Sequence, residues 1–154
     1  MRDIARSGAP PILCDSRHHG QMDIRLTTNN ATGALELRSL QRFGTKAGLV
    51  TFLVVRSGAF AAALPFYFDR ARLSDFIREL QMIDRTRSGT ATLKSSAEPG
   101  CITFEVDGSG HLRVFGILID AEEHEQRMEF SFGTDQGCLG QLVTDLAAFE
   151  KAHP

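Results

Sequence analysis

The spacing of apolar residues changes twice along this chain from the period of a strand to the period of a helix. Alternation with period two gives way to the 3.6-residue spacing of an amphipathic helix after Asp69, and the same change recurs before Leu139. A chain with this pattern needs a sheet with an apolar face and helices that cover that face. The pattern therefore predicts an α+β fold made of two diverged repeats, each with several strands followed by one helix.

Four strands are predicted in the first repeat. Residues 24–26 and 35–37 alternate between apolar and polar side chains. The run 49–55 is apolar on both parities, which is typical of a strand that is covered on both faces or lies in a subunit contact. Residues 60–68 alternate strictly, so their phenylalanines, Phe60 among them, are expected to fill the core.

The first helix is predicted to start after Asp69, because aspartate is a favoured N-cap residue. It is expected to run for about three turns and to be followed by a small charged loop at 84–87. Its apolar positions form one narrow stripe that must pack against a sheet: Leu73, Phe76, Ile77 and Leu80.

The second repeat shows the same order of elements. Four further runs have the pattern of strands, with a hairpin turn expected at 107–110: 91–93, 102–106, 112–119 and 128–132. Thr134 or Asp135 is the expected cap of the closing helix. The apolar residues of that helix follow helical spacing: Leu139, Leu142, Val143, Leu146 and Phe149.

A length of 154 residues suits one domain with a single core. We expect one domain over residues 22–154, with a predominantly antiparallel β-sheet of about eight strands and two amphipathic helices. Residues 1–21 contain two prolines and three arginines without apolar periodicity, so they are predicted to form a flexible N-terminal tail.

Charge and cysteine content narrow the environment of the protein. The 17 basic and 19 acidic residues give a formal net charge of −2, so no positive field is available to attract nucleic acid or anionic lipid. The apolar stretches are too short to cross a membrane as helices. Cys14, Cys101 and Cys138 are odd in number and lack C-x-x-C spacing, which fits neither a disulfide framework nor a zinc site. These features predict a cytoplasmic protein without a nucleic-acid or membrane partner.

Four segments carry a resemblance that spans most of the chain, from residue 23 to residue 149. They are GALELR at 33–38, FYFD at 66–69, GHLRV at 110–114 and FSFGTDQ at 130–136. Together with the apolar residues of the two helices, they resemble the WapI-type immunity proteins of bacterial polymorphic toxin systems, or a related family of small bacterial domains of unknown function. The resemblance implies a protein that neutralises a partner toxin by binding it.

The most distinctive polar segment is DAEEHE at 120–125. Its carboxylates and histidine could cover a basic toxin or hold a divalent cation, although a solvated hairpin tip commonly has the same composition. Consecutive acidic residues cannot all point at one ion, so no metal site is predicted. The candidate partner-binding residues are Asp120, Glu122, Glu123, His124 and Glu125.

No catalytic arrangement can be assembled from the sequence, because His111 has no serine or carboxylate placed to orient it. We therefore predict a non-enzymatic binding protein with a protein partner, such as a toxin, and without a cofactor. The alternative is a small-ligand-binding protein or enzyme with an apolar pocket between the sheet and the helices. The run 49–55 further predicts a homodimer that buries part of the sheet or an edge strand.

Overall fold

The computed structural model describes residues 20–44, 46–97 and 99–154. In these residues the chain forms eight β-strands and two α-helices, arranged as two groups of four strands that each precede a helix. The predicted α+β fold with two strands-then-helix repeats is therefore confirmed. The predicted tail at 1–21 lies outside the described residues except for Gly20 and Gln21, so it stays a prediction.

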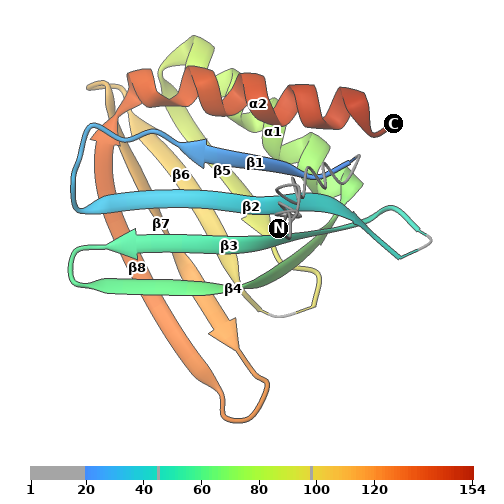
Figure 1. Cartoon of the computed structure of the whole chain (residues 1–154). Helices are drawn as coiled ribbons and strands as arrows, with labels where there is room; N and C mark the ends of the chain where they lie inside the picture. The colour runs from blue at the N-terminus through green and yellow to red at the C-terminus, as the bar shows by residue number, and fades with distance from the viewer. Residues whose placement is uncertain (1–19, 45, 98) are drawn as a thin grey trace, which may run out of the picture.

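The first sheet is an antiparallel meander in which consecutive strands are neighbours (Figure 1). Leu53 pairs with Leu37 on one side and Leu64 on the other, and all three side chains point into the core. A left-handed residue, Ser39 with φ of 51°, interrupts the regular pairing of the second strand. The strands are β1 (Met22–Leu26), β2 (Gly33–Phe43), β3 (Gly48–Ser57) and β4 (Phe60–Asp69).

The second sheet repeats this arrangement with the last four strands. Phe104 pairs with Ala91 on one side and Val114 on the other, and this row is again buried. The second sheet lies behind the first, and its strands cross those of the first (Figure 1). Its strands are β5 (Ser88–Lys94), β6 (Cys101–Asp107), β7 (His111–Asp120) and β8 (Gln126–Asp135), in that order across the sheet.

The first helix, α1 (Arg70–Thr86), begins where the sequence predicts. Asp69 caps it by accepting a hydrogen bond from the Arg72 N–H over 2.8 Å. The predicted length of three turns was too short, because Ile83 continues the buried stripe. The helix ends only at Arg87, whose left-handed φ of 60° lets its N–H donate to the Ile83 carbonyl. Residues 84–87 are therefore the last turn and its cap, not a charged loop.

The second helix, α2 (Leu139–Ala152), follows a short 3₁₀ turn (Gln136–Cys138). The prediction that Thr134 or Asp135 caps this helix was wrong, because Cys138 is its N-cap and makes no side-chain cap bond. Asp135 instead caps the 3₁₀ turn by accepting from the Gly137 N–H over 2.7 Å. Thr134 is buried, and its hydroxyl donates to Asn29 Oδ1 over 2.6 Å. This bond joins β8 to the connection between β1 and β2.

Each helix packs against the sheet of the other repeat. α1 lies along β5, where Glu79 Oε2 accepts a hydrogen bond from the Thr92 N–H over 3.0 Å, and α2 lies along β1. The two helices also contact each other above the core (Figure 1). Phe76 of α1 meets Phe104 of β6 edge to face, with ring centroids 5.6 Å apart. The core is therefore shared between the repeats.

Phe60 departs from the core predicted for β4. Its side chain is 74% exposed, whereas Phe66 and Phe68 on the same parity are buried. Phe60 pairs with Ser57 at the very end of the β3–β4 hairpin. Alternation sets which side of a sheet a residue faces, but burial also requires a layer over that part of the sheet.

Candidate functional site

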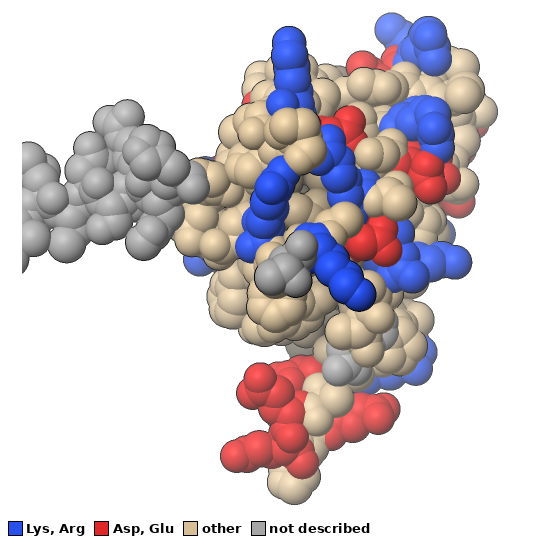
Figure 2. Space-filling model, turned by 90° about the vertical axis from the view of Figure 1, so that its right-hand side faces the viewer, with Lys and Arg blue, Asp and Glu red and all other residues tan. Residues whose placement is uncertain are grey.

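The predicted acidic segment forms the tip of the β7–β8 hairpin. Asp120 ends β7, Gln126 begins β8, and all of residues 120–126 are exposed. The hairpin extends past β4 in Figure 1, and its carboxylates form a projecting acidic group at one end of the molecule in Figure 2. The candidate residues Asp120, Glu122, Glu123, His124 and Glu125 are thus brought together on one exposed element.

The geometry of this tip is that of a turn. Asp120 Oδ1 accepts a hydrogen bond from the Glu122 N–H over 3.2 Å, which closes the connection after β7. Within residues 20–44, 46–97 and 99–154, no group of three or more His, Cys, Asp or Glu side chains is placed to hold a metal ion. The partner-binding role of these residues stays a prediction.

A groove runs between the base of this hairpin and β4. It has a volume of about 270 Å³, and its β4 side consists of three alanines and Leu64. Its hairpin side carries Leu118 and Met128, together with the polar residues Asp120, Gln126 and Arg127. The groove connects the acidic tip with the first sheet.

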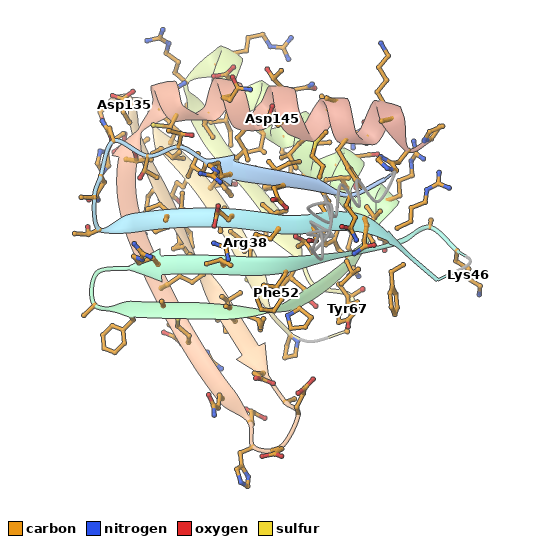
Figure 3. The ribbon with its side chains drawn as sticks, viewed as in Figure 1. Arg38, Lys46, Phe52, Tyr67, Asp135 and Asp145 are labelled. Carbon is orange, nitrogen blue, oxygen red and sulfur yellow. The ribbon has the colours of Figure 1, made fainter. Side chains whose placement is uncertain are left out.

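The outer face of the first sheet is partly apolar. Phe52 is 43% exposed, and Val50 and Val54 beside it on β3 are half-buried. Phe43 is 54% exposed and stacks edge to face on Tyr67, with centroids 5.2 Å apart. Arg38, Phe52 and Tyr67 lie on this face in Figure 3. In the run 49–55, the odd-numbered residues are therefore buried in the core. The even-numbered residues lie on the outer face of the sheet, which no described helix covers.

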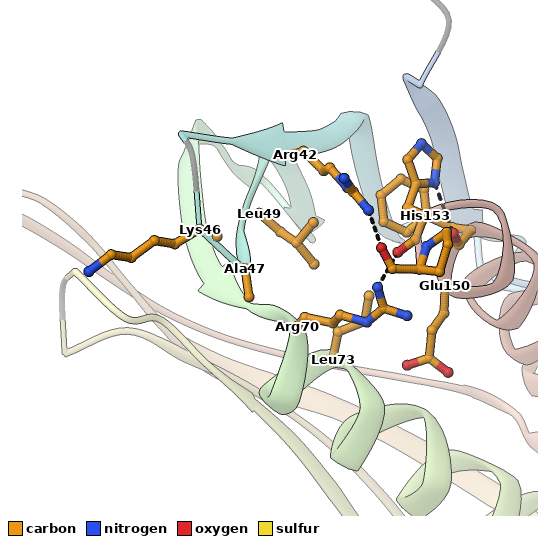
Figure 4. A pocket seen from close by; sticks show the side chains of 11 residues that line it. Arg42, Lys46, Ala47, Leu49, Arg70, Leu73, Glu150 and His153 are labelled. Carbon is orange, nitrogen blue, oxygen red and sulfur yellow. Dashed lines mark hydrogen bonds between the residues drawn. The ribbon is translucent and has the colours of Figure 1, made fainter.

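A basic pocket of about 280 Å³ lies at the other end of the sheet, between the β2–β3 turn and the two helices (Figure 4). The Arg42 guanidinium donates to the main-chain oxygen of Pro154, and the Arg70 guanidinium donates to the His153 carbonyl. Buried apolar side chains form its floor: Leu49, Leu73 and Phe149. Two guanidinium groups that converge on oxygen atoms above an apolar floor can bind a carboxylate or phosphate.

The interior between the sheets and the helices is tightly filled. The internal cavity there has a volume of about 10 Å³ and is lined by apolar side chains such as Leu37, Phe104 and Leu146. A cavity of this size holds at most a single water molecule. The alternative function stays a prediction, and the basic pocket, which residues of the first sheet and of both helices line, is the larger of these two spaces.

Sequence reasoning found the acidic tip but not the groove or the basic pocket. Each of those two features joins residues from distant parts of the chain, for example Ala63 with Arg127, and Arg42 with His153. The exposure of Phe52 could have been predicted, because Phe52 lies on the second apolar parity of 49–55.

Cys101 and Cys138 are half-buried free thiols. Across the described residues, no helix is long and apolar enough to span a membrane.

The described residues form a small α+β protein with an exposed acidic hairpin, a groove beside β4 and a basic pocket. The chain belongs to the immunity protein WapI-like family, whose model matches residues 22–154. The family resemblance seen in the four sequence segments is thereby confirmed.

Comparison with solved structures finds a similar chain described as "Crystal structures of trypanosoma bruciei MRP1/MRP2". It shares 12% identity, with 84% of this chain and 82% of that chain covered, at a TM-score of 0.48. This likeness is too distant to bear on function. No curated protein matches the chain.

Proposed function

We propose that this protein is a non-enzymatic, immunity-like protein that binds a partner toxin in the bacterial cytoplasm and neutralises it. The observation that carries the proposal is membership of the immunity protein WapI-like family over residues 22–154. Neutralisation by contact needs a rigid, complementary surface with a few anchoring side chains, and it needs no chemistry of its own.

The acidic tip is the proposed centre of the contact. Its four carboxylates belong to Asp120, Glu122, Glu123 and Glu125, and they project beyond the rest of the molecule (Figure 2). Exposed charge of one sign steers a partner of the opposite sign and fixes its orientation. The expected partner therefore presents a basic surface, as a nuclease toxin would.

Co-expression with the product of the adjacent gene tests this function. We expect a complex that survives size-exclusion chromatography and growth that is restored in cells producing that product. Absence of both the complex and the rescue would remove the toxin-neutralising role.

A matched pair of charge reversals tests the contact surface. Glu122→Lys/Glu123→Lys at the tip should weaken the complex at least tenfold and make binding less dependent on salt. Asp84→Lys/Asp145→Lys changes the net charge equally but lies on the two helices, so it should alter binding much less. Equal losses in the two double variants would show that only net charge matters and that the tip is not the contact.

The basic pocket favours a second candidate function, in which the protein binds a small anionic ligand. Arg42 and Arg70 both line this pocket, and each guanidinium donates to a main-chain oxygen, that of Pro154 and that of His153. A thermal-shift titration with citrate and inorganic phosphate tests it, with Arg70→Gln as the variant and Arg78→Gln on the same helix as its control. Stabilisation that Arg70→Gln abolishes and Arg78→Gln retains would establish the ligand site; identical curves would remove it.

A further inference from the structure

β4 lies at the end of the first sheet, and part of its outer edge has no strand partner. Among the described strands, β3 lies on one side of β4 and none lies on the other. Two other edge strands of the sheets are packed against helices: α2 lies along β1, and α1 lies along β5. An edge strand with free backbone groups is a template for an added strand.

The backbone groups that face outward can be assigned from one hydrogen bond. The Tyr67 carbonyl accepts from the Ser96 N–H over 2.8 Å, in the connection between β5 and β6, so Tyr67 directs its backbone groups away from β3. Because this direction alternates along a strand, Pro65, Ala63 and Ala61 also direct theirs outward. Pro65 has no N–H to offer, as is usual for proline on an edge. The N–H and C=O groups of Ala61 and Ala63 therefore point away from β3, and no described strand pairs with them.

The surroundings of this edge leave room for a strand. The groove of about 270 Å³ lies along 61–64, and the side chains of Ala61 and Ala63 are both small and exposed. β4 carries no charged side chain from Phe60 to Phe68, so the charged residues that usually block an edge are missing here. The open part is bounded by the exposed Phe60 at one end and by the Ser96 contact at the other.

Charge decides which occupant fits. The hairpin beside the groove carries the carboxylates of Asp120, Glu122, Glu123 and Glu125 against the single guanidinium of Arg127 in the groove lining. A second copy of this chain would bring the same excess of carboxylates to this edge, and like charges repel. An extended segment with basic side chains would instead be attracted.

We propose that the β4 edge from Phe60 to Pro65 takes up an extended basic segment of a partner protein as a fifth strand of the first sheet. This inference rests on the proposed protein-binding function and names the surface and the kind of segment that the partner supplies. Main-chain hydrogen bonds to Ala61 and Ala63 give the affinity, and the acidic hairpin selects lysine and arginine side chains.

A peptide titration followed by NMR tests the edge without knowledge of the natural partner. The probe is a capped hexapeptide of alternating lysine and valine, and the comparison peptide alternates glutamate and valine. We expect saturable shifts of the Ala61 and Ala63 amide signals with the basic peptide, and at least tenfold weaker binding of the acidic one.

Two substitutions at position 63 separate the contribution of the backbone N–H to peptide binding from that of the side chain. Ala63→Pro removes the outward N–H without touching the β3 ladder and should weaken the basic peptide at least tenfold, whereas Ala63→Val keeps the N–H and should bind within about twofold of the parent. Thermal melting confirms that each variant is folded, and Ala61→Pro replaces Ala63→Pro if that variant is not. Equal binding by the proline and valine variants, or no saturable shift up to about 1 mM peptide, would overturn the proposal.

Two further results would separate binding of a partner at the β4 edge from toxin neutralisation at another surface and from self-association through this edge. Rescue of growth on co-expression together with no peptide binding would retain toxin neutralisation and place its contact elsewhere. A free protein that sediments as a dimer and becomes a monomer in Ala63→Pro would show that a second copy occupies the edge, which also overturns the proposal.

Discussion

Phe60 and Phe68 occupy the same parity of β4, and their environments differ almost completely. Phe68 is 1% exposed and packs inside the core, whereas Phe60 is 74% exposed at the end of the hairpin. Periodicity alone gives both residues the same prediction. The difference arises because the layer over the inner face of the first sheet does not reach Phe60, and that layer is set by tertiary packing.

The two phenylalanines make a matched test of burial. Phe68→Ala should lower the free energy of unfolding by about 3–5 kcal/mol, because it removes buried apolar contacts and leaves a cavity. Phe60→Ala should change it by less than about 0.5 kcal/mol, as for other surface substitutions. Denaturant unfolding at equilibrium measures both values, and comparable losses would mean that Phe60 is covered in solution.

Among the elements, the start of α1 was predicted correctly, but its end and the start of α2 were not. The start of α1 followed from Asp69, whose side chain supplies the missing hydrogen-bond acceptor. Its end was missed, because Arg87 adopts the left-handed cap conformation that glycine usually marks. The acidic tip was predicted because it is local in sequence. The groove was not, because it depends on how the β7–β8 hairpin crosses β4.

The turn of the β6–β7 hairpin contains a carboxyl group, that of Asp107, whose pKa depends on hydrogen bonds within the turn. Asp107 Oδ1 accepts two hydrogen bonds from Ser109, one from its hydroxyl over 2.5 Å and one from its N–H over 3.0 Å. These bonds, and the hydroxyl bond most, hold the pKa of the Asp107 carboxyl below its usual value. The hydrogen bonds therefore contribute fully at neutral pH, and their contribution is lost as pH falls through the lowered pKa. Ser109→Ala should raise the Asp107 pKa in an NMR titration of the side-chain carboxyl carbon. An unchanged midpoint would mean that the turn is open in solution.

At the scale of the whole molecule, the outer face of the first sheet bears on self-association. The predicted homodimer stays a prediction, and Val50, Phe52 and Val54 now mark the face that would be buried in it. A stable contact would need to bury at least about 1,000 Å² in total. This face is distinct from the β4 edge, so a dimer formed here leaves the edge free.

Light scattering at micromolar concentration measures the dimer directly. We expect the mass of two chains for the parent protein and of one chain for Phe52→Glu, which places a charge in the contact. Met82→Glu is the control, because Met82 is a similarly exposed apolar residue on α1, and it should leave the mass unchanged. A parent protein with the mass of one chain would remove the dimer.

The exchange of helices between the repeats makes the two halves dependent on each other for folding. A fragment that ends at Arg87 would keep α1 but lose β5, and a fragment that begins at Ser88 would keep α2 but lose β1. Each would expose the apolar stripe that its helix buries in the intact chain. We expect neither fragment to melt cooperatively alone and the mixture to recover a sharp transition by calorimetry; a sharp transition in either fragment would contradict this. Although its sequence reads as two similar halves, the molecule should therefore unfold as one indivisible unit.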